Sequence, residues 1–338
     1  METILFISLI ISFLLTLIFL PKWIKKCKQI GLLWEDMNKP NHPKNAVAAS
    51  GGIVVVMAFI LGILTYLAIR TFILQIDGIA IYIFSLISVI LILTIVGLID
   101  DLFGWKQGGL STKFRLFLAF MASIPLIVIN SGTSTMIFPF IGEIQLGLLY
   151  PLILIPLGIA GATTTYNFLA GFNGLEAGQG IIILSFLSFV SYVTGTAWLS
   201  LVGMIMVVSL IVFYFYNKYP AKVFPGDSLT WSIGALIACM AILGNFEKIA
   251  VFIFSLYILE TILKLRGGLK KQSFAKPNKD GSLEMPYDKI YGLTHLSLFV
   301  LKKFKKKVYE TDVVYFIFII QILICLISLI IFKEALIL

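Results

Sequence analysis

The aspartates that stand out in this chain lie where long apolar runs begin or end. Asp100 and Asp101 close one run, and Asp227, within Phe224-Pro225-Gly226-Asp227-Ser228, precedes another. Adjacent carboxylates at the edge of a bilayer repel one another and are costly to bury, which favours metal binding or proton abstraction over two solvated acids at a helix end. Asp227 alone fits an N-cap. The three together favour a Mg²⁺ site, because Mg²⁺ takes carboxylate, phosphate and water oxygens.

A third polar stretch, residues 166–180, interrupts apolar sequence with two asparagines, one glutamate and four glycines, and it carries no basic residue. Glycine lets a backbone approach a ligand closely, and amide oxygens can ligate a hard cation. An ordinary glycine-rich turn is the alternative interpretation. The loops also contain lysines, such as Lys113, that could neutralise phosphate charge. We therefore expect a Mg²⁺-nucleotide from the water and a phosphate on a lipid to meet at these loops.

The composition requires a membrane setting for these loops. Of the 338 residues, 59% are hydrophobic and 13% charged, whereas a soluble chain has about 45–50% apolar and about 25% charged residues. The excess apolar surface must face lipid. Cys27, Cys239 and Cys325 are scattered and show neither metal-ligand spacing nor a disulfide framework. We expect residues 1–338 to form a single integral-membrane catalytic domain.

About ten segments are apolar and long enough to cross a bilayer as helices, which takes roughly 20 residues each. They lie near 3–20, 46–69, 79–99, 114–130, 148–165, 180–195, 197–216, 229–244, 248–264 and 313–332. The first run lacks a basic leading region and a cleavage site, so it is expected to remain as a span. The predicted fold is all-α and polytopic.

The positions of the basic residues predict the orientation. If the N-terminus is outside, the inner loops are 21–45, 100–115, 166–179, 217–228 and a long loop at about 265–312. All Lys and Arg residues lie in these loops, or at the edge of the last in the case of Lys264, except Arg70, Lys248 and Lys333. The positive-inside rule then predicts both termini outside and an active site built from five cytoplasmic loops at the cell membrane.

This distribution also explains the net charge of +9 as a topology signal and leaflet anchor, so nucleic-acid binding is not implied. The lysine run from Leu301 to Val308 is expected to be a surface helix on anionic lipid.

Taken together, the motifs resemble those of the polyprenyl-phosphate N-acetylhexosamine-1-phosphate transferases, of the glycosyltransferase family 4 type. The resemblance covers nearly the whole chain and is closest to the dolichyl-phosphate branch, which suggests an archaeal member. The motifs that carry it are Asp100-Asp101, the stretch from Asn167 to Gln179, Phe224-Pro225-Gly226-Asp227, and Gly281 to Met285.

The resemblance implies roles for the nucleotide side of the site. Asn167 and Asp227 would bind Mg²⁺, for which Mn²⁺ is a substitute, and the metal would bridge the pyrophosphate. Asn173 would contact uracil and Phe224 would stack on it. Further substrate-binding candidates are Gly174 and Glu176 in the same loop, and Ser50 and Gly51 at the start of the second span.

The resemblance also implies a phosphate side. Lys113 would neutralise phosphate, and Asp100 with Asp101 would orient or deprotonate the lipid phosphate. Relatives carry histidines or arginines in the last inner loop. This chain has Lys270 and Lys271 there, which become the candidates for contact with pyrophosphate.

The implied reaction is the Mg²⁺-dependent transfer of N-acetylglucosamine 1-phosphate from UDP-N-acetylglucosamine to dolichyl or polyprenyl phosphate. It releases UMP and begins lipid-linked glycan assembly for protein N-glycosylation. One alternative is the same chemistry with another UDP-N-acetylhexosamine for a cell-wall or surface polymer. A membrane transporter is another, although its site would lie near the midplane between internal repeats. The expected partners are the UDP-sugar, the lipid phosphate and the bilayer, with no nucleic acid; a homodimer is left open.

Overall fold

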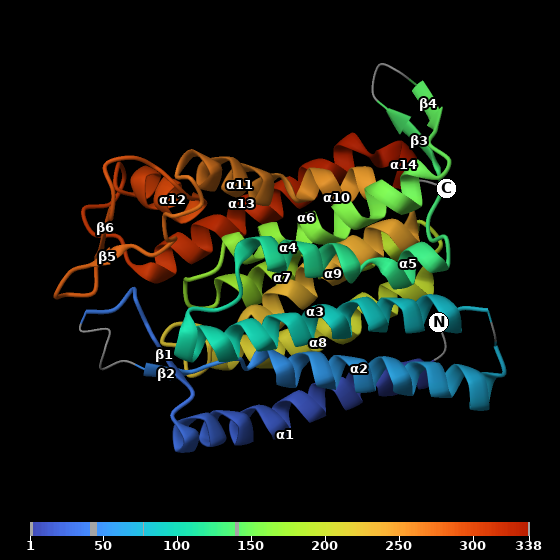
Figure 1. Ribbon diagram of the computed structural model, residues 1–338, viewed down its shortest axis with the longest axis horizontal. Helices are drawn as coiled ribbons and strands as arrows, with labels where there is room; N and C mark the ends of the chain where they lie inside the picture. Colours follow the sequence, from blue (N-terminus) through green and yellow to red (C-terminus); the bar gives the residue numbers. More distant parts are fainter. Residues whose placement is uncertain (1–2, 41–45, 77, 139–141, 337–338) are drawn as a thin grey trace.

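The computed structural model describes residues 3–40, 46–76, 78–138 and 142–336, and it consists mostly of helices lying side by side along one axis (Figure 1). Three short hairpins are the sheets of the described chain. They pair β1 (Leu33–Glu35) with β2 (Ala46–Ala48), β3 (Thr135–Phe138) with β4 (Gly142–Gln145), and β5 (Lys276–Pro277) with β6 (Leu283–Glu284). The predicted all-α character of a polytopic membrane protein is confirmed.

Within the described residues, seven helices are long and apolar enough to cross a membrane. They are α1 (Ile7–Ile30, entered by the turn Thr3–Phe6), α2 (Gly52–Ala68, extended by Ile69–Leu74), α3 (Ala80–Gln107), α7 (Leu175–Val193), α8 (Ala197–Asn217), α9 (Asp227–Gly244) and α13 (Glu310–Ile331). Each overlaps one of the segments predicted from the sequence, but α1 continues to Ile30 and α3 to Gln107, into stretches that were predicted as inner loops.

The other three predicted segments are each divided. The first becomes α4 (Thr112–Met121) and α5 (Ile124–Val128). The second becomes a π-helical turn (Tyr150–Leu154, called the wide turn below) and α6 (Ile155–Phe168), and the third becomes α10 (Glu247–Ile253) and α11 (Ser255–Arg266). Prolines lie in the first turn of α5, of the wide turn and of α6. A proline removes an amide donor and clashes with the preceding turn, which explains the first two divisions.

Helix α9 lies at the centre of the bundle. It contacts α2, α3, α6, α7, α8 and α10, and most of its side chains are buried. Its N-terminus, at Asp227, is therefore surrounded by other elements, and the polar groups found there belong to one enclosed region.

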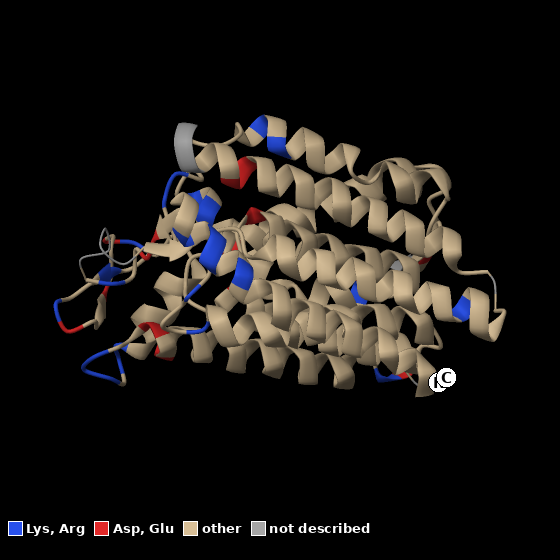
Figure 2. Ribbon diagram, turned by 90° about the horizontal axis from the view of Figure 1, so that it is seen from below, with Lys and Arg blue, Asp and Glu red and all other residues tan. Residues whose placement is uncertain are grey.

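Charged residues gather at one end of the bundle, as Figure 2 shows. We call this the charged end; β1, β2, β5, β6 and α12 (Leu293–Leu301) lie there, whereas the first and last described residues lie at the opposite end (Figure 1).

The lysine run at the charged end departs from expectation. Helix α12 stops at Leu301, and the following residues form turns rather than a surface helix. Three lysines of the run pair with acids of the same region instead: Lys302 with Glu284, Lys305 with Asp312, and Lys307 with Asp280. The prediction of a surface helix over 301–308 was wrong, because side-chain pairing across the loop replaces helical periodicity.

Candidate active site

Two segments far apart in the sequence join through their backbones to frame the site. The amide of Phe224 donates to the carbonyl of Ala48 (2.8 Å), and the amides of Gly51 and Gly52 donate to the carbonyls of Phe224 and Pro225 (both 2.9 Å). A Cβ on Gly52 would overlap Leu229, so only glycine allows this approach. The Ser50-Gly51-Gly52 motif thus serves to bring the loop before α9 against the start of α2.

Asp101 fixes the first turn of α9. Its Oδ1 accepts from the amide of Asp227 (2.8 Å) and its Oδ2 from the amide of Ser228 (3.5 Å). The first amides of a helix lack partners within the helix, and a carboxylate there also complements the helix dipole. Gly97, one turn earlier on α3, faces the backbone of Asp227, where a Cβ would not fit. Asp101 is therefore a cap supplied by a neighbouring helix.

Asp100 turns toward α4. Its Oδ2 lies 2.8 Å from Nη1 of Arg115, and its Oδ1 accepts from the amide of Leu110 (2.5 Å). The same Nη1 lies 3.6 Å from Oδ2 of Asp227. Arg115 thus connects Asp100 with Asp227.

A cavity of about 230 Å³ opens beside the start of α9. Its walls include six of the predicted site residues: Ser50, Asp101, Asn167, Glu176, Phe224 and Asp227. Four aromatic rings also line it, those of Trp34, Phe172, Phe224 and Phe274. Flat rings around a small cavity suit a planar heterocycle, because base–aromatic stacking tolerates any base. We call this the nucleotide cavity.

A second cavity, of about 530 Å³, lies between α4, α6 and α11. Arg115, Lys264 and Lys271 line it together with Trp231 and several threonines. Asn167 and Ala170 line both this cavity and the nucleotide cavity, so the two are adjacent. We call it the basic groove.

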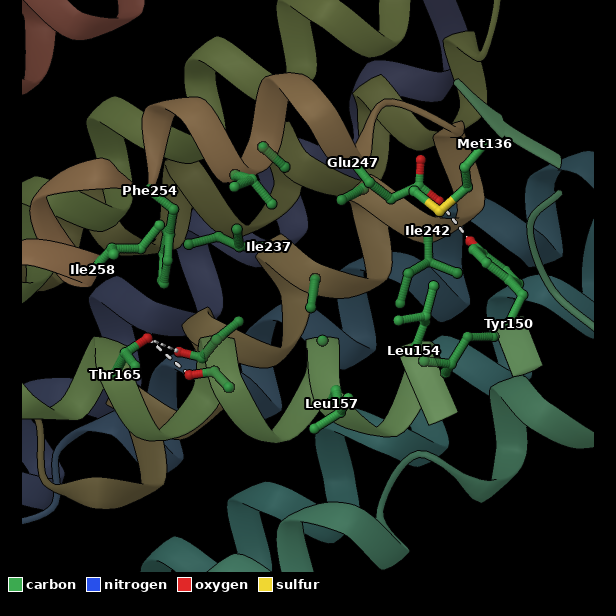
Figure 3. Close-up of a pocket in the computed structure, with 18 residues that line it drawn as sticks. Met136, Tyr150, Leu154, Leu157, Thr165, Ile237, Ile242, Glu247, Phe254 and Ile258 are labelled. Carbon is green, nitrogen blue, oxygen red and sulfur yellow. Dashed lines mark hydrogen bonds between the residues drawn. The ribbon is translucent and has the colours of Figure 1, made fainter. Parts of the chain in front are cut away.

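A third cavity, of about 440 Å³, continues along α6 and is almost wholly apolar. Gly161 and Thr165 line both it and the basic groove. Figure 3 shows Leu157 of α6, and Leu154 just before α6, facing Ile237, Ile242 and Phe254 across this apolar cavity.

At the opposite end of the bundle, Tyr150 closes the apolar cavity by donating its hydroxyl hydrogen to Glu247 (2.5 Å) (Figure 3). Glu247 and Met136 also line a further cavity of about 220 Å³ at this end of the bundle.

Comparison with known proteins agrees with this arrangement. Residues 83–245 match the family model described as glycosyl transferase family 4. The chain is 34% identical to a protein of Saccharolobus solfataricus over 91% of both chains, and 33% identical to one of Sulfolobus acidocaldarius over 96% of this chain and 95% of the relative. Both carry the provisional name UDP-N-acetylglucosamine–dolichyl-phosphate N-acetylglucosaminephosphotransferase.

The chain belongs to glycosyl transferase family 4. It is also 30% identical to the phospho-N-acetylmuramoyl-pentapeptide-transferase of Streptococcus agalactiae over 75% of this chain and 76% of the relative. The family covers phosphoglycosyltransferases, so this chain is an enzyme of that kind.

The oxygen donors of this family 4 enzyme suit Mg²⁺. Asp227 and Asn167 line the same cavity, and Oδ1 of Asn167 accepts from the hydroxyl of Thr230 (3.1 Å), which orients the amide. Among the described residues, no three acidic, histidine or cysteine side chains form a metal cage by themselves. Mg²⁺ does not need one, because it is usually held by one or two carboxylates with waters and substrate phosphates.

The basic residue nearest the aspartates is Arg115, which the sequence reasoning missed in favour of Lys113. Lys113 is exposed on α4 and makes no ion pair with any residue the structure describes. Residues two apart on a helix point to different sides, so only one of the two can face Asp100. The sequence did contain a reason to prefer Arg115, because the planar guanidinium of arginine binds carboxylate and phosphate groups with two parallel hydrogen bonds.

Asn173 lies beside the nucleotide cavity but is not among the described residues that line it. Its amide nitrogen donates to Asp36 (3.0 Å) and to both oxygens of Glu310 (2.9 Å each), and its backbone amide donates to Glu310 (2.6 Å). Asn173 thereby ties its loop to α13 and to the segment after β1. No motif in the sequence indicated Asp36 or Glu310 as partners of Asn173. The predicted contact between Asn173 and uracil stays a prediction.

The remaining candidates occupy different places. Glu176 is buried and accepts from the amide of Gly171 (2.7 Å), which shapes the cavity wall. Gly174 has a positive φ of 82° and is the N-cap residue that precedes α7. Lys270 and Lys271 are both exposed; Lys271 lines the basic groove, whereas Lys270 is not among the described lining residues.

Proposed function

We propose that this family 4 enzyme transfers N-acetylglucosamine 1-phosphate from UDP-N-acetylglucosamine to dolichyl or another polyprenyl phosphate, with Mg²⁺, for which Mn²⁺ can substitute. The observation that carries the proposal is the succession of three adjacent cavities. An aromatic cavity with Asn167 and Asp227 adjoins a basic groove, and the groove continues as an apolar cavity along α6. A nucleotide, a phosphate and an isoprenoid chain need these environments in this order. The names of the two archaeal relatives supply the donor and the acceptor.

In the nucleotide cavity, Phe224 is positioned to stack on the base, and Asp227 with Asn167 would hold the metal. Mg²⁺, when bound, neutralises the pyrophosphate and stabilises UMP as a leaving group. Asp101 holds Asp227 in place by capping α9. The residues therefore act mainly through positioning, which is the main contribution of protein groups to phosphoryl transfer.

On the other side, Arg115 offers its guanidinium to the acceptor phosphate in the basic groove, held in orientation by Asp100. An oxygen of the lipid phosphate attacks the β-phosphorus, the bond from that phosphorus to the bridging oxygen breaks, and UMP leaves. The product is a lipid pyrophosphate carrying the sugar. Because one pyrophosphate bond replaces another, the reaction is expected to be reversible.

We further propose that the three divided segments also cross the bilayer, giving ten spans, with both termini outside and the active site on the cytoplasmic face. The gathering of Lys and Arg at the charged end (Figure 2) supports this orientation through the positive-inside rule. The central position of α9, with contacts to most of the bundle, supports treating residues 1–338 as a single catalytic domain.

The deciding experiment is to incubate the purified protein with Mg²⁺, UDP-N-acetylglucosamine and polyprenyl phosphate, and to measure UMP with and without the lipid. Lipid-dependent UMP establishes the reaction and the donor together. Release only from another UDP-N-acetylhexosamine would keep the chemistry and change the sugar. A folded protein that releases UMP from no UDP-sugar would overturn the proposal, and flux assays in liposomes would then test the transporter alternative.

A further inference from the structure

Lys270 and Lys271 are adjacent lysines, and the sequence alone makes both of them candidates for contact with pyrophosphate. The structure separates them: Lys271 lines the basic groove, and Lys270 is not among the described residues that line the cavities above. A lysine on a surface loop is normally a mobile charge. The surroundings of Lys271 show why this one is different.

Lys271 is exposed, but it makes contacts at its backbone, its stem and its ammonium. Its carbonyl accepts from the ammonium of Lys264 (3.0 Å), and its stem passes so close to Gly267 that a Cβ there would lie 2.9 Å from its Cγ. Its ammonium lies 4.8 Å from the ring centre of Tyr287 and 5.7 Å from that of Tyr291. Cations within about 6 Å of an aromatic ring are attracted by the ring's quadrupole, so the ammonium is fixed without being neutralised.

The two rings are themselves fixed. Tyr287 packs edge-on against Tyr291 (5.7 Å between centres) and against His295 (5.6 Å), and His295 is buried and bonded to the carbonyl of Phe274 (3.2 Å). Lys264 also binds the hydroxyl of Ser273 (2.6 Å). The last loop thus presents a single preorganised cation at the basic groove.

A second cation lies across α6 from it. Arg115 enters the basic groove from α4, whereas Lys271 enters from the loop that follows α11. Leu116, Leu265 and Leu269 are exposed and line the same groove, which gives it an apolar margin. Among the described residues, the groove is lined by three cations, of which Lys264 also pairs with Glu260 (3.8 Å). Cations inside the groove and apolar side chains at its margin suit a phosphate monoester on an apolar chain.

We infer that Lys271 and Arg115 together bind the acceptor's phosphate, and that Tyr287 and Tyr291 are positioning residues for Lys271. The inference rests on the proposed function, and it assigns the last loop to the acceptor rather than to the nucleotide sugar. The donor's pyrophosphate bears the same chemistry, so the test must distinguish the two phosphates.

The test is steady-state kinetics with each substrate varied in turn, using Lys271→Gln, Lys271→Arg and Lys270→Gln, with Lys279→Gln as an exposed control from the same loop. Lys271→Gln should raise KM for polyprenyl phosphate about 10- to 100-fold, the usual effect of removing a charged hydrogen-bond donor. KM for UDP-N-acetylglucosamine should stay near that of the wild type. Lys271→Arg should restore most of the loss, Lys270→Gln should have a smaller effect, and Lys279→Gln none.

The positioning role has its own readout. Tyr287→Leu and Tyr291→Leu should each raise KM for the lipid phosphate in the wild type but add nothing to Lys271→Gln, because they act through Lys271. Additive effects would mean that the tyrosines serve only the fold.

A rise in KM for the UDP-sugar, or equal effects at Lys270 and Lys271, would overturn the inference. Wild-type UMP release would at the same time keep the proposed function intact.

Discussion

At the scale of single residues, three aspartates that look equivalent in sequence have three different tasks. Asp101 caps α9, Asp100 orients Arg115, and Asp227 is the carboxylate that shares its cavity with Asn167. Their positions at the ends of apolar runs were readable from the sequence. The division of tasks was not, because it depends on which side chains of other helices lie opposite.

Asp227→Ala should therefore remove activity while the fold persists. We expect a loss of more than about 100-fold in kcat/KM, since even groups that only support a metal ligand cost 10- to 100-fold. UMP release measures the loss, and an unfolding midpoint in detergent close to that of the wild type shows that the fold is intact. Full activity in this variant would remove the metal assignment.

Asp101→Ala should instead weaken the fold as well as the activity. Loss of a helix cap typically costs about 0.5–2 kcal/mol, and here the cap comes from another helix. A lower midpoint of thermal unfolding would verify this role. An unchanged midpoint with lost activity would place Asp101 in the chemistry instead.

His295 gives a prediction about pH. Burial lowers the pKa of His295, and the nearby Lys264 ammonium lowers it further, whereas the bond to the Phe274 carbonyl opposes the shift. The unfolded chain then binds a proton more readily than the folded one, so stability is complete above about pH 6.5 and falls as the pH drops below it. Unfolding midpoints at about pH 7.5 and about pH 5.5 should differ more in the wild type than in His295→Gln. An equal difference in both would show that His295 does not contribute.

At the scale of elements, the site depends on close approaches between backbones. The starts of α2 and α9 meet because Gly52 has no side chain, and α3 lies against the first turn of α9 because Gly97 has none. The sequence indicated that Ser50 and Gly51 mattered. It could not show what they approach, since the partner lies more than 170 residues away in the chain.

Gly97→Ala should push α9 away from α3. Overpacking of this kind costs about 1–3 kcal/mol, and the shift should lower kcat because Asp227 moves with the helix. Gly161→Ala on α6 is the matched control for stability, because a Cβ there meets nothing within 4 Å. Equal unfolding midpoints for the two variants would contradict the close-packing argument.

The divided segments show where sequence patterns lose information. Of the ten apolar runs predicted from hydropathy, seven correspond to helices long enough to span a membrane among the described residues, and three contain a break. Residues 148–165 were predicted as one continuous span, and Pro151 and Pro156 were the unused signal for the break found there. The break at Phe254, between α10 and α11, had no comparable signal.

At the scale of the whole molecule, the gathering of basic residues at one end of the bundle is what the sequence predicted most directly, whereas the side of the membrane that this end faces stays a prediction. Basic residues are counted along the chain without knowledge of contacts, and Figure 2 shows the result in space. The order of the three cavities was beyond such counting, because each is lined by helices from distant parts of the chain.

The proposed orientation predicts the outcome of cysteine labelling. Cys27, Cys239 and Cys325 are buried, so single cysteines introduced at exposed sites report on their own surroundings. Lys248→Cys, in α10 at the end opposite the charged end, should react with a membrane-impermeant maleimide added to intact cells. Lys279→Cys should react only after the membrane is opened. The reverse pattern would invert the topology.

The bond between Tyr150 and Glu247 has a consequence for the membrane itself. The apolar cavity along α6 lies between the basic groove and the cavity at the opposite end of the bundle, and it shares lining residues with both. Apolar cavities of this kind stay free of water, and the tyrosine and the glutamate satisfy each other where that dry section ends. The apolar section along α6 therefore blocks the passage of ions along the row of cavities. The enzyme can thus lie in a membrane that maintains an ion gradient.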